Sequence, residues 1–174
     1  MIVLMAGLPA SGKSTLSKEL ARRLSGTVLD KDRLRFGLFE ERDIEYSTAQ
    51  DDLCVSILLE AAAFILEKDS SRFVFLDGRP FSRAYQIDTA LKVAAELKQE
   101  WRIIECVCSE DTARKRLSED QASGDHLAAN RNFELYEWVK RQFEEIKLPK
   151  VIIDTDQPLE ACIDLALNGI SRNA

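Results

Sequence analysis

Hydrophobic residues of this chain gather in short runs separated by longer segments of helical period. The runs have the length of buried strands and are rich in Ile, Val and Phe. They are Ile2 to Ala6, Thr27 to Leu29, Phe73 to Leu76, Ile103 to Val107 and Val151 to Ile153. Because most of them are apolar at successive positions rather than at alternate ones, we expect strands covered on both faces, as in a parallel sheet.

The segments between these runs repeat apolar residues every three or four positions, which is typical of amphipathic helices. Such stripes begin at Leu16, Cys54, Ile87 and Leu159, and Phe133 to Ile146 has a helical pattern as well. Strands that alternate with helices predict an α/β fold with a mainly parallel five-stranded sheet between two helical layers, joined by right-handed connections.

One stretch, from Leu117 to Asn132, is polar and interrupts the helical period. It fits an ordinary surface loop, and it also fits a mobile lid that closes over a reaction and excludes water. We predict a lid over approximately residues 114–132.

Composition narrows the class of protein. A chain of 174 residues with 45% hydrophobic content can bury one sizeable core, so we predict one domain over residues 1–174. No apolar run is long enough for a membrane span or has the flanks of a secretory signal, which predicts a cytoplasmic protein. A net charge of −6 disfavours a broad nucleic-acid-binding face but is compatible with a local basic pocket.

The cysteines lack zinc-site spacing. Cys54, Cys106, Cys108 and Cys162 form no C-x-x-C pair, and the chain has one histidine. We therefore expect buried reduced thiols rather than a zinc site.

The strongest motif follows the first predicted strand. The sequence GLPASGKS matches G-x-x-x-x-G-K-[ST], and a helical segment comes after it. In this arrangement the backbone N–H groups surround phosphates, the lysine reaches the outer phosphates and the serine hydroxyl binds Mg²⁺. The predicted nucleotide-binding residues are Gly7, Leu8, Pro9, Ala10, Ser11, Gly12, Lys13, Ser14 and Thr15. With this motif, the predicted fold class becomes a three-layer P-loop NTPase fold with a helical lid.

A charged cluster, DKDRLR at residues 30–35, follows the second predicted strand. Ligands of doubly wound sheets bind beyond the carboxyl ends of the strands, where this cluster is expected. A carboxylate here can take the proton of an acceptor hydroxyl, and an arginine can orient the acceptor. We favour Asp32 as the base and Arg35 as the orienting residue, with Asp30 as the alternative base. A salt-bridged helix start is the plainer interpretation.

The third predicted strand ends in FVFLDGR, an apolar run closed by Asp77. This pattern is typical of a Walker B element, whose carboxylate serves the metal or contacts the acceptor. We predict Asp77 as a Mg²⁺ residue together with Ser14. The plainer interpretation of Asp77 is an Asp that closes a strand at a turn, which is common without function. Arg79 follows as a further candidate.

Past the fourth predicted strand, Ser109 precedes two acids as in a capped helix start, and the cations Arg114, Lys115 and Arg116 follow. A cation on this helix can neutralise charge that develops on the transferred phosphoryl group. Arg116 is the preferred catalytic candidate, against the alternative of a solvated basic face.

With these residues in place, the chain resembles the P-loop kinases of the zeta-toxin and polynucleotide-kinase-like group. The D-x-x-R spacing of Asp32 and Arg35 matches the acceptor side of polynucleotide 5′-hydroxyl kinases, which implies that Asp32 is the general base. The family's lid often carries R-x-x-x-R, but Arg116 is followed by Asp120 at the second position. The resemblance therefore shifts the second lid arginine to Arg131.

Together these features predict a kinase that uses ATP and Mg²⁺ to phosphorylate a hydroxyl of a small molecule. A nucleic-acid 5′-hydroxyl kinase is the nearest alternative, supported by D-x-x-R and opposed by the acidic composition. A nucleotide-dependent switch or binding ATPase is the alternative from another class. The sequence leaves the acceptor and the oligomeric state open.

Overall fold

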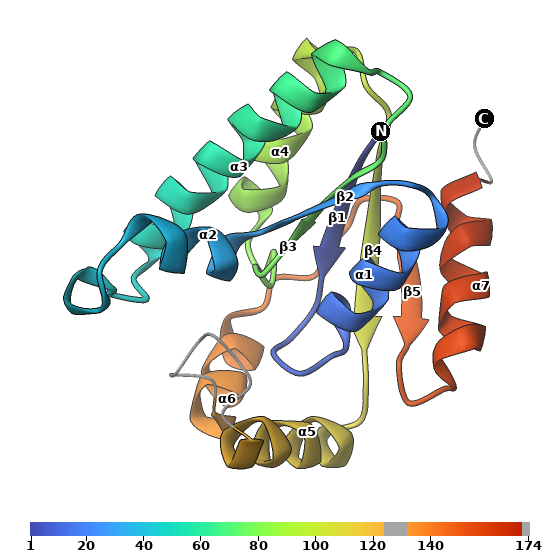
Figure 1. Cartoon of the computed structure of the whole chain (residues 1–174). Helices are drawn as coiled ribbons and strands as arrows, with labels where there is room; N and C mark the ends of the chain where they lie inside the picture. The colour runs from blue at the N-terminus through green and yellow to red at the C-terminus, as the bar shows by residue number, and fades with distance from the viewer. Residues whose placement is uncertain (124–131, 172–174) are drawn as a thin grey trace.

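The computed structural model describes residues 1–123 and 132–171. Strands and helices alternate along most of the chain (Figure 1). In order they are β1 Ile2–Ala6, α1 Lys13–Arg23, β2 Thr27–Asp30, α2 Lys31–Leu38, the 3₁₀ turn η1 Glu41–Asp43, α3 Thr48–Lys68, β3 Val74–Asp77, α4 Ala84–Glu96, β4 Trp101–Val107, α5 Glu110–Ser123, α6 Phe133–Gln142, β5 Val151–Asp154 and α7 Leu159–Ser171.

The five strands form one parallel sheet in the order β2-β3-β1-β4-β5. The central strand β1 is buried at every position because successive side chains enter opposite layers. Ile2, Leu4 and Ala6 join one hydrophobic core, and Val3 and Met5 join the other. This explains why the strand reads as an unbroken apolar run.

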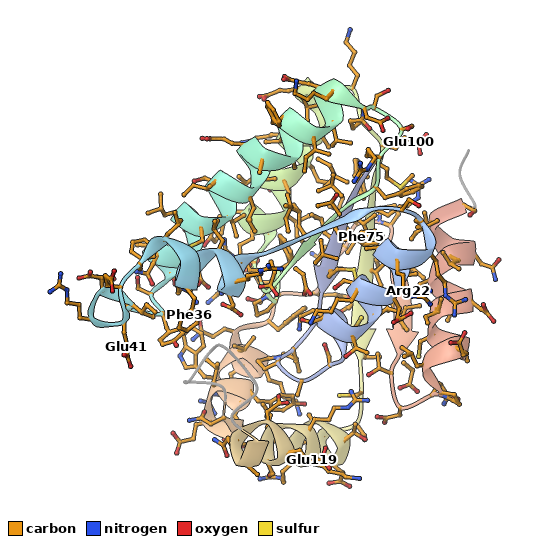
Figure 2. All side chains as sticks on the ribbon, in the orientation of Figure 1. Arg22, Phe36, Glu41, Phe75, Glu100 and Glu119 are labelled. Atoms are coloured by element: carbon orange, nitrogen blue, oxygen red, sulfur yellow. The ribbon has the colours of Figure 1, made fainter. Side chains whose placement is uncertain are left out.

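Helices cover both faces of the sheet, with α3 and α4 on one side and α1 and α7 on the other (Figure 1). Figure 2 shows Phe75 in the crowded interior, whereas Glu41 projects from the tip of the segment after α2. In Figure 1, α5 and α6 lie beyond the arrowheads of β1 and β4, that is, at the carboxyl ends of the strands. Those ends are where an α/β sheet places its ligands.

The predicted α/β architecture is confirmed: the described residues form a five-stranded parallel sheet with helices on both faces. No helix among the described residues is long and apolar enough to cross a membrane. Within the same residues, no three His, Cys, Asp or Glu side chains gather as a metal cluster.

Two expectations were wrong in their bounds. The interruption expected from Leu117 does not occur there, because α5 continues to Ser123. Ion pairs one turn apart, Glu110 with Arg114 and Lys115 with Glu119, support this helix without a long apolar stripe. The helix from Phe133 ends at Gln142 rather than Ile146, because Phe143 is extended, with φ −71° and ψ 113°. The rest of the predicted lid, residues 124–131, lies outside the described residues.

All four cysteines are free thiols. Cys54, Cys106 and Cys162 are buried as expected, but Cys108 is only partly buried, since it follows the end of β4. Burial raises the pKa of the Cys106 thiol to about 12.

Candidate active site

The loop between β1 and α1 has the backbone of a phosphate cradle. Gly7 and Gly12 have φ values of 132° and 81°, which favour glycine. A Cβ on Gly7 would lie 2.2 Å from the Cys106 carbonyl oxygen, so the loop runs directly against β4 at this point. Helix α1 begins with no side-chain cap and no acid in its first turn, which leaves its N–H groups suited to an anion.

Lys13 folds back over this loop. Its Nζ atom donates hydrogen bonds to the carbonyl oxygens of Gly7 at 2.9 Å and Leu8 at 2.6 Å. The ammonium group therefore lies inside the curve of the loop, where a polyphosphate would replace carbonyl oxygens as its partner. The predicted loop residues 9–15 line a cavity of ≈ 1220 Å³, whereas Gly7 and Leu8 do not line it.

The carboxyl end of β2 contributes the second wall of the same cavity. Asp30 caps α2, since its Oδ1 atom accepts hydrogen bonds from the backbone N–H groups of Asp32 at 2.8 Å and Arg33 at 3.2 Å. Burial raises the pKa of Asp30, the hydrogen bond from Arg33 opposes this, and the neighbouring charge of Asp77 adds to the increase. The cap fixes the first turn of α2 and with it the position of Asp32.

Asp32 and Arg35, predicted from their spacing, are brought together. The Arg35 guanidinium is 1% exposed and donates to Asp32 Oδ1 at 2.9 Å. Lys31 Nζ lies 3.1 Å from the same oxygen. Burial lowers the pKa of Lys31, and the charge of Asp32 opposes that decrease.

Asp51 completes this network, and the sequence analysis missed it. Its Oδ1 atom accepts from Arg35 and, at 2.8 Å, from Lys31. Asp51 lies in the first turn of α3, where an acid is ordinary because it favours the positive end of the helix. A locally sufficient reason for the residue therefore hid its second role.

Asp77 lies at the carboxyl end of β3, opposite Asp30 in the strand register. It is 1% exposed, and its Oδ2 atom accepts a hydrogen bond from Ser17 at 2.8 Å. Ser17 is one turn beyond Ser14 on α1, so the carboxylate is tied to the helix that carries the predicted metal ligand. Hydroxyl and carboxylate oxygens are the ligands that Mg²⁺ prefers, so the chemistry of Ser14 and Asp77 is compatible with the metal site predicted from the sequence.

Arg79 forms a second ion pair, in which the arginine is buried and its partner Asp52 is partly exposed. Arg79 is 3% exposed, and its Nη2 atom donates to Asp52 Oδ1 at 2.5 Å. The hydroxyl of Tyr85 lies 3.3 Å from the same Nη2 atom. Arg79 and Tyr85 line the cavity, whereas Asp52 does not.

Arg116 lines the cavity and is held against the loop by hydrogen bonds. Its Nη1 atom donates to the carbonyl oxygen of Ala10 at 3.1 Å and to Thr155 Oγ1 at 3.0 Å, and its Nη2 atom donates to the Thr155 carbonyl at 2.8 Å. Thr155 Oγ1 is in turn 3.1 Å from the Ser11 carbonyl. Arg116 thus joins α5, the cradle and the segment after β5.

The other lid arginines are elsewhere. Arg114 stacks on the Phe133 ring at 3.5 Å from its centroid and pairs with Glu110, away from the cradle. Arg131 lies outside the described residues.

Comparisons with known proteins agree with this architecture. A family model described as AAA domain matches residues 2–146. No curated protein matches the sequence. A solved structure from Chloroflexus aurantiacus, described as a kinase candidate, is similar with a TM-score of 0.74 and 23% identity, covering 97% of both chains.

Two further similar structures carry named activities. The Mycobacterium tuberculosis APS kinase CysC, solved with AMPPNP and APS, has a TM-score of 0.72 and 20% identity, covering 97% of this chain and 96% of that one. A Sinorhizobium meliloti gluconokinase has a TM-score of 0.70 and 18% identity, covering 98% and 91%. At these identities the likeness establishes the shared fold.

Proposed function

The chain belongs to the AAA domain family, and from this premise we propose that it is an ATP-dependent kinase that phosphorylates a hydroxyl of a small molecule. The observation that carries the proposal is that the phosphate cradle and the Asp32 cluster line the same cavity. A site that only binds or hydrolyses ATP has no need of a second wall with a carboxylate and buried cations. The APS kinase and the gluconokinase, which share the fold, support the proposal as kinases named for small-molecule substrates.

Each wall has a distinct task in this proposal. The cradle N–H groups and Lys13 hold the β and γ phosphates of ATP, and Ser14 and Asp77 would hold Mg²⁺. The metal, when bound, neutralises phosphate charge. Ser17 keeps the Asp77 carboxylate turned toward α1 by the hydrogen bond described above.

Asp32 is the proposed general base. Its Oδ1 atom is occupied by Arg35 and Lys31, so we assign the acceptor's proton to Oδ2. The two cations fix the carboxylate in direction. As the proton leaves the hydroxyl, that oxygen bonds to the γ-phosphorus and the bond to the ADP oxygen breaks.

The variant Asp32→Asn tests this role. We expect the rate of phosphoryl transfer to fall by about 10²–10⁴-fold, the usual cost of losing a general base. The affinity for ATP should stay within a few-fold, because Asp32 lies across the cavity from the cradle. Transfer is measured by mass spectrometry on a metabolite mixture incubated with labelled ATP, and affinity by titration with AMPPNP.

Asp88→Asn is the matched control. Asp88 is an exposed acid on α4 outside the cavity, so its loss should leave both measurements unchanged. Near-normal transfer by Asp32→Asn would refute the assigned base. If no metabolite gains a phosphate while ATP is slowly hydrolysed, the protein is a nucleotide-dependent switch or binding ATPase instead.

An oligonucleotide arm separates the remaining alternative. A nucleic-acid 5′-hydroxyl kinase would phosphorylate an oligonucleotide in preference to sugars and nucleosides, with activity that falls steeply with salt. We expect the reverse preference, since the chain has a net charge of −6.

A further inference from the structure

Helix α6 presents an apolar stripe to the cavity. Leu135, Trp138 and Val139 line it, and the polar Gln142 follows at the end of the same helical face. The Trp138 side chain is 49% exposed, although it belongs to the residue types that carry the most hydrophobic surface. An exposed tryptophan on the wall of a charged cavity indicates a ligand with an apolar face.

Two tyrosines line the same cavity from other elements. Tyr85 of α4 is 46% exposed, and its hydroxyl is held 3.3 Å from both carboxylate oxygens of Asp52. Tyr46 precedes α3 and lies 5.1 Å from the Arg35 guanidinium, measured to its ring centroid. Its φ of 52° is unusual for a bulky residue, which is a strain that proteins tend to keep at functional sites.

Contacts between helices tie the tryptophan and one tyrosine to the same wall. The Arg83 guanidinium donates to the Gln142 side chain, and the Ala84 N–H donates to Glu144 Oε2 at 2.8 Å. Tyr85 is the next residue along α4, and Trp138 is one turn before Gln142 on α6. Trp138 and Tyr85 therefore flank this junction between α4 and α6.

Charges at the acceptor end of the cavity are already matched. Lys31 and Arg35 share the carboxylates of Asp32 and Asp51, and Arg79 pairs with Asp52. An anionic acceptor would have to compete with these carboxylates for the buried cations. A neutral acceptor needs no such exchange. Its hydroxyl can lie at Asp32 while a flat ring of the same molecule contacts Trp138 and Tyr85, which we call the aromatic wall.

We propose that the acceptor of this site is an uncharged alcohol that carries a flat ring, bound with the ring against Trp138 and Tyr85 and the hydroxyl toward Asp32. This assignment rests on the proposed kinase function for the role of the hydroxyl. The binding of the ring is independent of it, because stacking requires no transfer of phosphate.

Trp138 can report this binding directly. The chain has two tryptophans, and the other, Trp101, begins β4 beside Ile2 at the amino end of the sheet. In Trp101→Phe, the fluorescence therefore comes from Trp138 alone. The probes are thymidine and benzyl alcohol as neutral ring alcohols, 4-carboxybenzyl alcohol as their anionic counterpart, and sorbitol as a polyol without a flat ring.

We expect saturable fluorescence changes with thymidine or benzyl alcohol, and affinity at least about tenfold weaker for the carboxylated alcohol and for sorbitol. Equal or tighter binding of either of these, or no response to the neutral ring alcohols, would overturn the proposal. So would complete protection of Trp138 from acrylamide by AMPPNP alone, because the nucleotide or the protein itself would then cover the stripe and leave no place for the acceptor's ring.

Substitution of the ring provides the second measurement. Trp138→Ala should weaken the binding of the ring alcohols about tenfold by calorimetry, whereas Trp138→Phe should restore most of the affinity. The matched control is Phe64→Ala, which removes a 61% exposed ring on α3 outside the cavity and should have no effect. Equal losses in Phe64→Ala and Trp138→Ala would also overturn the assignment.

Phosphorylation of the same probes separates the two proposals. Ring alcohols that bind without gaining phosphate would leave the aromatic wall standing and contradict the kinase. Phosphate transfer to sorbitol in preference to the ring alcohols would leave the kinase standing and contradict the aromatic wall.

Discussion

Gly7→Ala perturbs the cradle at its tightest point. The new Cβ would lie 2.2 Å from the Cys106 carbonyl oxygen and 2.8 Å from Ser11 Oγ. The Cys106 carbonyl cannot move away easily, because it belongs to β4, which is hydrogen-bonded to β1 in the sheet. In addition, Gly7 has a φ of 132°, which an L-residue with a side chain rarely adopts.

The cost follows from adding these two effects. Forcing extra volume into a packed region costs about 1–3 kcal/mol, and a left-handed backbone costs a residue with a Cβ about 1–2 kcal/mol. The sum of ~2–5 kcal/mol is large against the ~5–15 kcal/mol that hold a typical domain together. It greatly exceeds the few tenths to ~1 kcal/mol gained by restricting the unfolded chain.

Gly37→Ala is the matched control. A Cβ on Gly37 meets no atom within 4 Å, and the residue lies in α2, where alanine is favoured by about 0.5–1 kcal/mol. Urea unfolding of both variants should therefore give midpoints on opposite sides of the parent protein. With m near 1–3 kcal/mol/M, the two midpoints should differ by about 1 M or more.

The same substitution should also weaken nucleotide binding. Lys13 Nζ hydrogen-bonds to the Gly7 carbonyl, so a shift of the loop displaces the ammonium group. AMPPNP affinity is measured on whatever fraction folds at low temperature. Equal unfolding midpoints for Gly7→Ala and Gly37→Ala would refute the close packing of the cradle against β4.

Two further variants test the walls of the cavity. Asp30→Asn should raise the melting temperature at neutral pH and lose that advantage toward pH 4. The raised pKa of Asp30 means that its charged form destabilises the fold, and this cost is absent below the unfolded pKa and complete above the folded pKa. Asparagine avoids the cost and still caps α2. A stability advantage that grows on acidification would contradict this. Arg116→Ala should weaken AMPPNP binding about tenfold with little change in kcat, because three hydrogen bonds between α5, the cradle and Thr155 are lost. A fall in kcat at unchanged affinity would instead favour the catalytic role predicted from the sequence.

The sequence was most informative where a few consecutive residues determine both conformation and chemistry. The cradle is such a case, since its glycines set the backbone as expected, and the chemistry proposed for its lysine and serine comes from the same short segment. The strand runs were informative for a similar reason: burial on both faces makes β1 apolar at every position. The bounds of α5 were missed because ion pairs stabilise that helix without the apolar period by which helices are recognised.

The cavity wall opposite the cradle could not be predicted in the same way. Each of its residues is common at its position in a helix, so the sequence gives no sign of a second role. Asp51 suits a helix start, and Tyr85 and Trp138 suit amphipathic helices. What makes them a site is the parallel sheet, which brings the segments after β2, β3 and β5 to one edge. In the proposed kinase, the phosphate donor is thus specified by a contiguous motif, whereas the acceptor is specified by helices far apart in the chain. The cradle can consequently stay the same while single substitutions on α4 and α6 change the wall opposite it. We expect the acceptor specificity of this protein to depend on the apolar stripe of α6.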